Sequence, residues 1–330
     1  MANLTPPYAA EVTEAASELP PLGRTHQIDS RRGLGYVMAI AGALAFSVNG
    51  SVSKVTLESG VDSLSLVLLR CAGATVGFFL LVLLIEPRRL RVGRHELPLL
   101  LVYGVIGIAL VQWLYFVAIA RLPVGVALLL EFTAPVLVAL WARFVQHQNL
   151  GRSVWLALGL ALAGLTLVAQ VWQGFSLDVI GVVAGLGAAL SLATYYIAGK
   201  QAMTSRDTLS LAFWAFVIAT AFWTVVHPWW TVPWDLMNES VALPGGLDST
   251  VPVWGLITWI IVLGTVVPFL LVLGALRHLP VTTAGIVGMV EPVLAGVVAW
   301  LWLDETLSFT QIVGAIVVLV GIVVAQLATN

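Results

Sequence analysis

Three ionisable residues stand inside long apolar stretches of the sequence: Arg70, Glu131 and Glu291. A charged side chain at the centre of a bilayer costs about 3 kcal/mol on insertion scales, so each residue needs a partner or a function. The planar guanidinium of arginine can donate two parallel hydrogen bonds to a carboxylate. A buried carboxylate can in turn bind an ammonium group or a proton. Arg70 together with Glu131 could therefore bind a zwitterionic molecule such as an amino acid.

Arg70 and Glu131 are expected to lie at similar depth. At a helical rise of about 1.5 Å per residue, Arg70 lies about 12 Å and Glu131 about 10 Å from the outer ends of their segments. We therefore predict that Arg70 is the partner of Glu131 in the absence of substrate. Two interpretations stay open: a structural salt bridge, or a pair that exchanges its partners for the carboxylate and ammonium groups of a substrate.

Glu291 is followed by Pro292, which removes an amide donor and frees a backbone carbonyl. A protonated Glu291 that donates to such a carbonyl is one interpretation. The other is a proton-coupling site that loads and releases a proton during a transport cycle, with Glu131 as a second proton-coupling candidate.

Four uncharged residues complete the candidate binding site. Asn49 and Gln112 are candidates because a buried amide demands hydrogen-bond partners. Tyr195 and Trp214 could line a cavity, although packing and interface anchoring are the alternatives for aromatic residues. The predicted substrate-binding residues are Arg70, Glu131, Asn49, Gln112, Tyr195 and Trp214.

These residues must be positioned by membrane helices. Of the 330 residues, 60% are hydrophobic and 10% are charged, against about 25% charged in soluble domains. A spanning helix needs about 20 mostly apolar residues. Ten stretches qualify: 34–54, 63–85, 98–119, 124–145, 153–171, 179–200, 208–228, 252–275, 281–302 and 309–327. The fold class is therefore an all-α polytopic membrane protein with ten transmembrane helices.

The positions of Lys and Arg orient these ten spans. Alternate connections should be basic on the cytoplasmic side. Twelve of the fifteen basic residues fall on one side, and only Lys54 and Arg121 fall on the other. We predict cytoplasmic N- and C-termini, with residues 1–32 as a disordered cytoplasmic tail. The connection 229–251 is then external, and its tryptophans suit the membrane interface.

The two halves of the sequence resemble each other. The stretch "ARLPVGVALLLEFTAPVLVAL" at 120–140 aligns with "RHLPVTTAGIVGMVEPVLAGV" at 277–297, at an offset of 157, and "DSLSL" at 62–66 matches "DTLSL" at 207–211. We predict a five-helix repeat over 33–171 and a second over 176–327. Because five is odd, the second repeat is inverted in the membrane, which is typical of secondary transporters that bind substrate near the midplane.

The stretches "EFTAPVLVAL" and "MVEPVLAGVVAWLWLDETLS" resemble the EamA branch of the drug/metabolite transporter superfamily, and within it the bacterial inner-membrane threonine/homoserine exporters. The resemblance covers about residues 34–327 and departs at Asp304, where glycine is usual. It implies a secondary-active, multi-pass transporter of the inner membrane. The expected activity is export of amino acids or related small metabolites, with proton coupling as the candidate driving force. The alternatives are another substrate, or a receptor or scaffold without transport.

Several partners and activities are not expected. A net charge of −2 argues against nucleic acid, and one cysteine, Cys71, allows neither an internal disulfide nor a paired-cysteine zinc site. No HExxH motif, paired aspartates within spans or phosphate-binding GxxxxGK[ST] motif occurs. We expect no cofactor, no metal and no enzymatic activity. The expected partners are membrane lipid and a small-molecule substrate, and spans 5 and 10 are expected at the periphery or in a homodimer contact.

Overall fold

The computed structural model describes residues 25–85, 90, 92–147, 152–169, 177–245, 249–275, 278–279, 287–288 and 290–328. Within these ranges, seven helical segments are long and apolar enough to cross a membrane: Arg32–Glu58, Ser63–Ile85, Leu97–Ile119, Val124–Phe144, Val179–Ala202, Thr208–Val226 and Val253–Val272. They correspond to predicted spans 1 to 4 and 6 to 8. The other three predicted spans contain α8 (Arg152–Ala169), α14 (Glu291–Leu303) and α15 (Phe309–Ala328). The ten-span count and its orientation remain predictions.

Four of these seven segments are each one uninterrupted helix: α2 (Thr25–Glu58), α3 (Ser63–Ile85), α9 (Val179–Ala202) and α10 (Thr208–Val226). Helix α2 begins at Thr25 and so extends into the segment predicted as a disordered tail, 1–32. Only residues 25–32 of that segment lie in the described ranges, and they differ from the prediction because they continue the helical turns of the apolar span that follows.

The "DSLSL" and "DTLSL" motifs have the same structural role. Asp62 caps α3, where its side chain accepts from the amides of Leu64 and Ser65 at 2.9 and 3.0 Å. Asp207 caps α10 in the same way, at 3.1 Å from the amides of Leu209 and Ser210. An aspartate at this position satisfies amide donors that have no partner within the helix. The repeated motif is therefore a repeated helix start.

Two of the predicted spans contain wide π-helical turns. Span 3 consists of α4 (Leu97–Val102), the π-helix η2 (Tyr103–Leu110) and α5 (Val111–Ile119). Span 8 consists of α11 (Val253–Ile261), η6 (Val262–Val266) and α12 (Val267–Ala275). At the repeat offset of 157, the two π-helices occupy equivalent positions. Such turns are rare and are frequent at functional sites.

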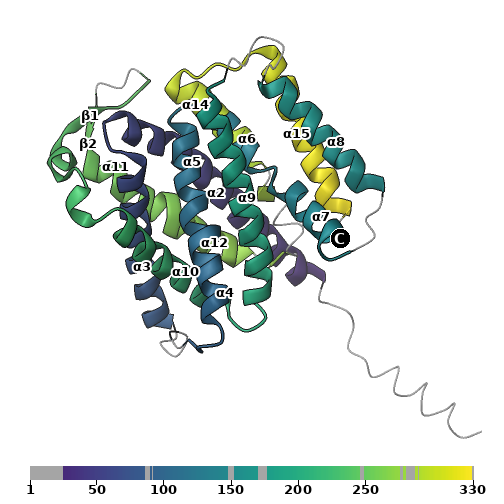
Figure 1. The fold of residues 1–330 in the computed structure, drawn as a ribbon, viewed down its shortest axis with the longest axis horizontal. Coiled ribbons are helices and arrows are strands. Elements are labelled where there is room, and N and C mark those ends of the chain that lie inside the picture. Colours follow the sequence, from purple (N-terminus) through teal and green to yellow (C-terminus); the bar gives the residue numbers. More distant parts are fainter. Residues whose placement is uncertain are drawn as a thin grey trace, which may run out of the picture.

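The helix contacts follow a two-fold pattern between the repeats. Helix α2 packs on α12 and α14, and its counterpart α9 packs on α5 and on α7 (Ala134–Phe144), which are the equivalents of α12 and α14. Equivalent helices also pair with each other: α3 with α10, and α8 with α15. Spans 4 and 9 meet where α6 (Val124–Glu131) packs on α14. Figure 1 shows α8 and α15 side by side at one edge of the bundle. This pattern of contacts fits two related halves that share one interior.

Helices α8 and α15 meet through two glycines. A side chain at Gly164 would lie 2.7 Å from the carbonyl oxygen of Gly314, and one at Gly314 would lie 2.8 Å from that of Gly164. Small residues allow membrane helices to approach this closely. The peripheral position expected for spans 5 and 10 agrees with this arrangement, and the homodimer contact remains a prediction.

The predicted external connection folds onto the end of the bundle. It contains the 3-10 turns η4 (Trp229–Thr231) and η5 (Trp234–Asn238), then the antiparallel strands β1 (Ser240–Ala242) and β2 (Thr250–Pro252), with Val241 opposite Val251. The indole nitrogen of Trp302, in α14, donates to the carbonyl of Pro244 at 3.1 Å. This hydrogen bond ties the hairpin to α14.

Asp304 has a left-handed backbone, with φ 54° and ψ 25°, directly after α14. This conformation favours glycine because glycine has no Cβ to clash with its own carbonyl. The departure from the usual glycine noted in the sequence therefore falls at a helix C-terminus that requires a left-handed residue.

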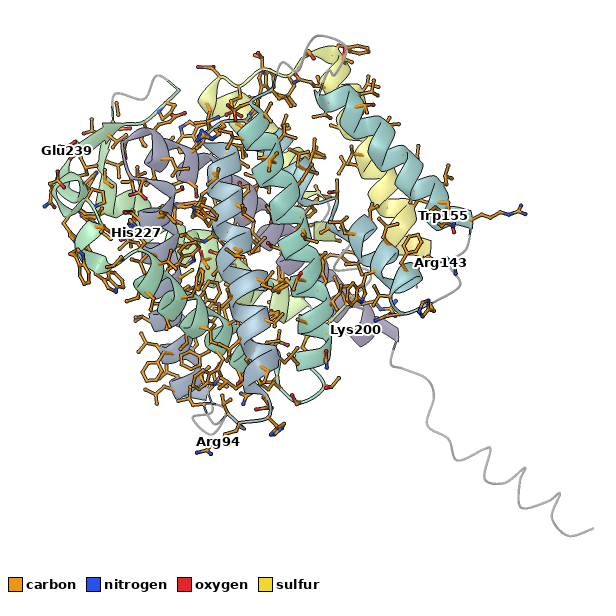
Figure 2. All side chains as sticks on the ribbon, viewed as in Figure 1. Arg94, Arg143, Trp155, Lys200, His227 and Glu239 are labelled. Atoms are coloured by element: carbon orange, nitrogen blue, oxygen red, sulfur yellow. The ribbon has the colours of Figure 1, made fainter. Side chains whose placement is uncertain are left out.

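Charged residues separate along the bundle. Figure 2 shows Arg94, Arg143 and Lys200 toward one end, and His227 and Glu239 toward the other. This distribution is compatible with the predicted basic cytoplasmic side. We use "outer end" below for the end that carries the hairpin.

Candidate functional site

The site is built where two helices break. In span 4, α6 ends at Glu131 and α7 (Ala134–Phe144) begins after Phe132 and Thr133. Pro135 has no amide hydrogen, so it cannot donate to the carbonyl of Glu131, four residues earlier. In span 9, α14 begins at Glu291 with Pro292 in its first turn. Each glutamate therefore stands at a helix break next to a proline.

Half-helices that end within a membrane place polar backbone groups at its midplane. Glu291 lies in the first turn of α14, where the positive end of the helix dipole favours a carboxylate. Glu131 follows the last turn of α6, and its carbonyl lacks its helical donor. Both side chains are half-buried. The arrangement offers two carboxylates and a backbone acceptor to a cationic group or a proton.

Arg70 is buried in α3 and lies against span 8. Its Nε donates to Thr265 Oγ1 at 2.9 Å, and its Nη2 donates to the carbonyl of Gly264 at 3.4 Å. The hydroxyl of Thr265 itself donates to the carbonyl of Ile260 at 2.8 Å. The carbonyl of Gly264 has no α-helical donor, because the residue four positions later, Pro268, has no amide hydrogen. The Thr265 hydroxyl beside it is a side-chain group that the backbone hydrogen bonds of a helix do not use.

The predicted ion pair between Arg70 and Glu131 is wrong for this state. No ion pair between them occurs among the described residues, although Arg70 interacts electrostatically with both Glu131 and Glu291. The guanidinium pairs with span 8 because η6 places two oxygens directly against it. The Nη1 of Arg70 has no hydrogen bond to any described residue. The edge of the guanidinium formed by Nη1 and Nη2 can therefore donate hydrogen bonds to a ligand.

Asn49 and Gln112 join this cluster through their neighbours. A Cβ at Gly264 would collide with the side chain of Asn49, so Asn49 lies beside the residue that binds Arg70. Gln112 lies one turn before Tyr115 on α5, and a Cβ at Gly50, next to Asn49, would lie 2.6 Å from the Tyr115 hydroxyl. The Oδ1 of Asn49 and the Oε1 of Gln112 are buried and accept no hydrogen bond from the described part of the chain. A buried acceptor without a donor costs about 1–3 kcal/mol, which a ligand donor would remove.

The two aromatic candidates have different surroundings. Tyr195 stacks on Tyr103, with ring centroids 5.1 Å apart, at the contact of α9 with η2. Trp214 packs edge-to-face on Phe213 at 5.4 Å. Neither has a hydrogen bond, ion pair or ring contact with Arg70, Glu131 or Glu291 among the described residues. The indole nitrogen of Trp214 is buried and has no hydrogen-bond partner in the described part of the chain. The assignment of both residues to the binding site remains a prediction.

One residue of the cluster, Thr265, was missed by the sequence analysis. Thr265 was one of few polar residues within the apolar stretch 253–275, but nothing in the sequence marked the π-turn that presents it to Arg70. A metal site is not supported within the described ranges, where no group of three His, Cys, Asp or Glu residues could hold an ion.

The bundle, its two related halves and the polar cluster at the helix breaks define a membrane transporter of the repeat type. The EamA-like transporter family model matches residues 33–170 and again residues 179–326. The chain belongs to the EamA-like transporter family.

Relatives of the chain include named exporters. It is 31% identical to the threonine/homoserine exporter RhtA of Escherichia coli (strain K12), over 73% of this chain and 76% of the relative. It is 25% identical to the pseudopaline exporter CntI of Pseudomonas aeruginosa, over 87% and 94% of the two chains. A solved crystal structure covers 89% of this chain and 97% of its own, with a TM-score of 0.54 and 19% identity, which supports the fold alone. The chain is thus a multi-pass protein of the cell membrane.

Proposed function

We propose that the protein is a secondary-active exporter of amino acids similar to threonine and homoserine, driven by protons and without enzymatic activity. The observation that carries the proposal is the composition of the cluster: an arginine with one unused edge, two carboxylates, and two buried amide oxygens without donors. These groups are complementary to a hydroxylated zwitterion. The name of the relative RhtA supports the same substrate class.

The binding mode follows from the hydrogen-bonding capacities. The substrate carboxylate accepts from Nη1 and Nη2 of Arg70, while Nε keeps its bond to Thr265. The substrate ammonium donates to the Glu131 carboxylate and to the carbonyl that Pro135 leaves free. A side-chain hydroxyl donates to Gln112 or Asn49, which removes the cost of an unpaired buried acceptor.

Glu291 serves as the proton-coupling residue in this proposal. It lies at the start of α14, and α14 packs on both α2 and α6. A change in its charge therefore acts where three segments of the site meet. The hydroxyl of Ser47, in α2, lies 3.0 Å from the carbonyl oxygen of Glu291, so α2 is coupled directly to this helix break.

The test is uptake into everted membrane vesicles with an imposed proton gradient and a panel of amino acids, peptides and drugs. Threonine and homoserine should be accumulated, and alanine less well because it has no hydroxyl for Gln112. Arg70→Lys should lower affinity about tenfold or more, because lysine cannot donate in parallel to a carboxylate. Accumulation of drugs or metallophores without amino acids would support the alternative substrate, for which the relative named pseudopaline exporter CntI is the precedent.

A further inference from the structure

A second charged cluster lies near the outer end of the bundle, apart from the candidate binding site. Lys54, in the last two turns of α2, has its Nζ 2.5 Å from Glu305 Oε1 and donates to the carbonyl of Leu122 at 3.1 Å. The other oxygen of Glu305 accepts from the amide of Val124 at 2.9 Å. The two side chains are only 16% and 13% exposed. All four groups are therefore paired.

This cluster joins three segments that also carry the binding site. Lys54 follows Asn49 on α2, Val124 begins the helix that ends at Glu131, and Glu305 follows α14, which begins at Glu291. The cluster thus ties together the ends of the three helices that hold the site residues. Separating these ends requires that the ion pair and both backbone hydrogen bonds break.

Helices α6 and α14 also pack closely against each other, just inside this cluster. A Cβ built on Gly125 would lie 3.0 Å from the Cα of Gly296, so α6 and α14 meet backbone to backbone. No side chain, and no substrate, fits between backbones at this separation. The charged cluster therefore caps a close backbone contact between α6 and α14.

We propose that Lys54 and Glu305 form the outer gate of the transport path. This inference rests on the proposed function in so far as the path carries a substrate. In the closed state the Lys54–Glu305 pair holds α2, α6 and α14 together, and its rupture lets α14 move away from α6 at Gly125 and Gly296. Exposure of the site to the outer side then requires the gate to open.

The two repeats differ at the gate positions, so only one end of the bundle carries this ion pair. The stretch "GALAFSVNGSVSK" at 42–54 aligns with "AALSLATYYIAGK" at 188–200, so the counterpart of Lys54 at the other end is Lys200. The counterpart of Glu305, at the offset of 157, is Gln148. Gln148 lies outside the described residues, but its side chain carries no charge. Only the outer end has an acid and a base at these positions, so the ion pair selectively stabilises the state that is closed outward.

The experiment measures accessibility from outside, independently of any substrate. Ser51→Cys places a reporter one turn inward of Lys54, in a Cys71→Ala background without other cysteines. Ser51 is fully buried, and its hydroxyl has no partner among the described residues. Intact cells are treated with a membrane-impermeant maleimide. We expect slow labelling of the reporter alone, and labelling about tenfold faster after Glu305→Gln or Lys54→Met, because a charge-assisted pair is lost.

A matched control is the other ion pair at this end. Arg121 lies 4.0 Å from Asp178, and both side chains are about 40% exposed or more. Arg121→Met removes a charge from the same end without touching the gate, and should leave the labelling rate unchanged. An equal rise in this control would mean that labelling follows surface charge, and would overturn the proposal.

Exchange of the two gate charges provides a second measurement. Lys54→Glu with Glu305→Lys restores an ion pair, but sets a carboxylate against the carbonyl of Leu122 and an ammonium against the amide of Val124. Labelling should therefore stay fast. Slow labelling in the exchanged variant would show that the backbone hydrogen bonds do not hold the gate closed. Slow labelling in Glu305→Gln would show that the ion pair does not hold it closed. If labelling becomes faster but the protein exports no amino acid, the gate proposal stands and the proposed substrate is wrong. If the protein exports amino acids but the labelling rate does not change, the proposed substrate stands and the gate proposal is wrong.

Discussion

At the scale of single residues, Thr265 positions Arg70, and this role can be tested without removing the charge of Arg70. Thr265→Val keeps the size of the side chain but removes the acceptor for Nε. Substrate affinity should fall about 10- to 150-fold, which corresponds to the 1.5–3 kcal/mol of a hydrogen bond to a charged group. Thr258→Val is the control, because Thr258 is exposed and bonds only within its own helix. Equal binding by the two variants, measured by calorimetry, would remove Thr265 from this role.

The role of Glu291 in proton coupling can be tested separately from substrate binding. Glu291→Gln keeps the volume of the side chain but cannot release a proton. We expect the variant to exchange labelled for unlabelled substrate across vesicles and to lose accumulation driven by a pH gradient. Glu239→Gln, on the exposed outer connection, should behave as the unmodified protein. Gradient-driven accumulation at the unmodified rate would assign coupling to another group, with Glu131 as the next candidate.

Glu96 provides a test of pH dependence outside the membrane-spanning segments. Hydrogen bonds from Arg206, at 2.7 and 3.2 Å, and from the amide of Gly93 hold its pKa below the ordinary value for glutamate. The stabilisation is therefore present above about pH 4.3 and is lost as pH falls through the lowered value. Glu96→Gln should cost about 1–2 kcal/mol at pH 7 and less with increasing acidity. Exposed Glu58→Gln should show no such loss in thermal unfolding.

At the scale of elements, the end of α14 carries avoidable strain. Asp304 is left-handed, which favours glycine. Asp304→Gly should stabilise the protein by about 0.5–1 kcal/mol. The measurement is a thermal unfolding curve in detergent. Asp304→Ala keeps a Cβ and should give no such gain; an equal gain would point to removal of the charge as the cause.

The positions of the helices could be predicted from the sequence better than the places where the helices are interrupted. Asp62 and Asp207 precede apolar stretches, so the starts of α3 and α10 could be derived from capping. Pro135 and Pro292 indicated the two breaks beside the glutamates. The π-helices η2 and η6 were not predicted, because an extra residue in one turn leaves no local signature in a uniformly apolar stretch. The predicted partner of Arg70 was wrong because two acceptors in span 8 were overlooked: the Thr265 hydroxyl, and the Gly264 carbonyl that Pro268 leaves without an α-helical donor.

At the scale of the whole molecule, orientation is the prediction that most needs a test. Single cysteines in the Cys71→Ala background should be labelled from outside at Glu239 and only after permeabilisation at Arg94, since twelve of fifteen basic residues lie on the predicted inner side. Figure 2 places these two residues at opposite ends of the bundle. Labelling of Glu239→Cys only after permeabilisation would reverse the orientation and make the proposed outer gate an inner one.

The position of α2 also has a consequence for biosynthesis. Its main partners, α12 and α14, are among the last helices to be made, and more than two hundred residues of chain separate the end of α2 from the start of α14. At about 5–20 residues per second, α2 waits roughly 12 to 50 s for α14. During that time Ser47, Asn49, Ser51 and Lys54 have no α14 to pack against. The nascent first half thus needs the insertion machinery or a membrane chaperone to hold this polar face until translation ends.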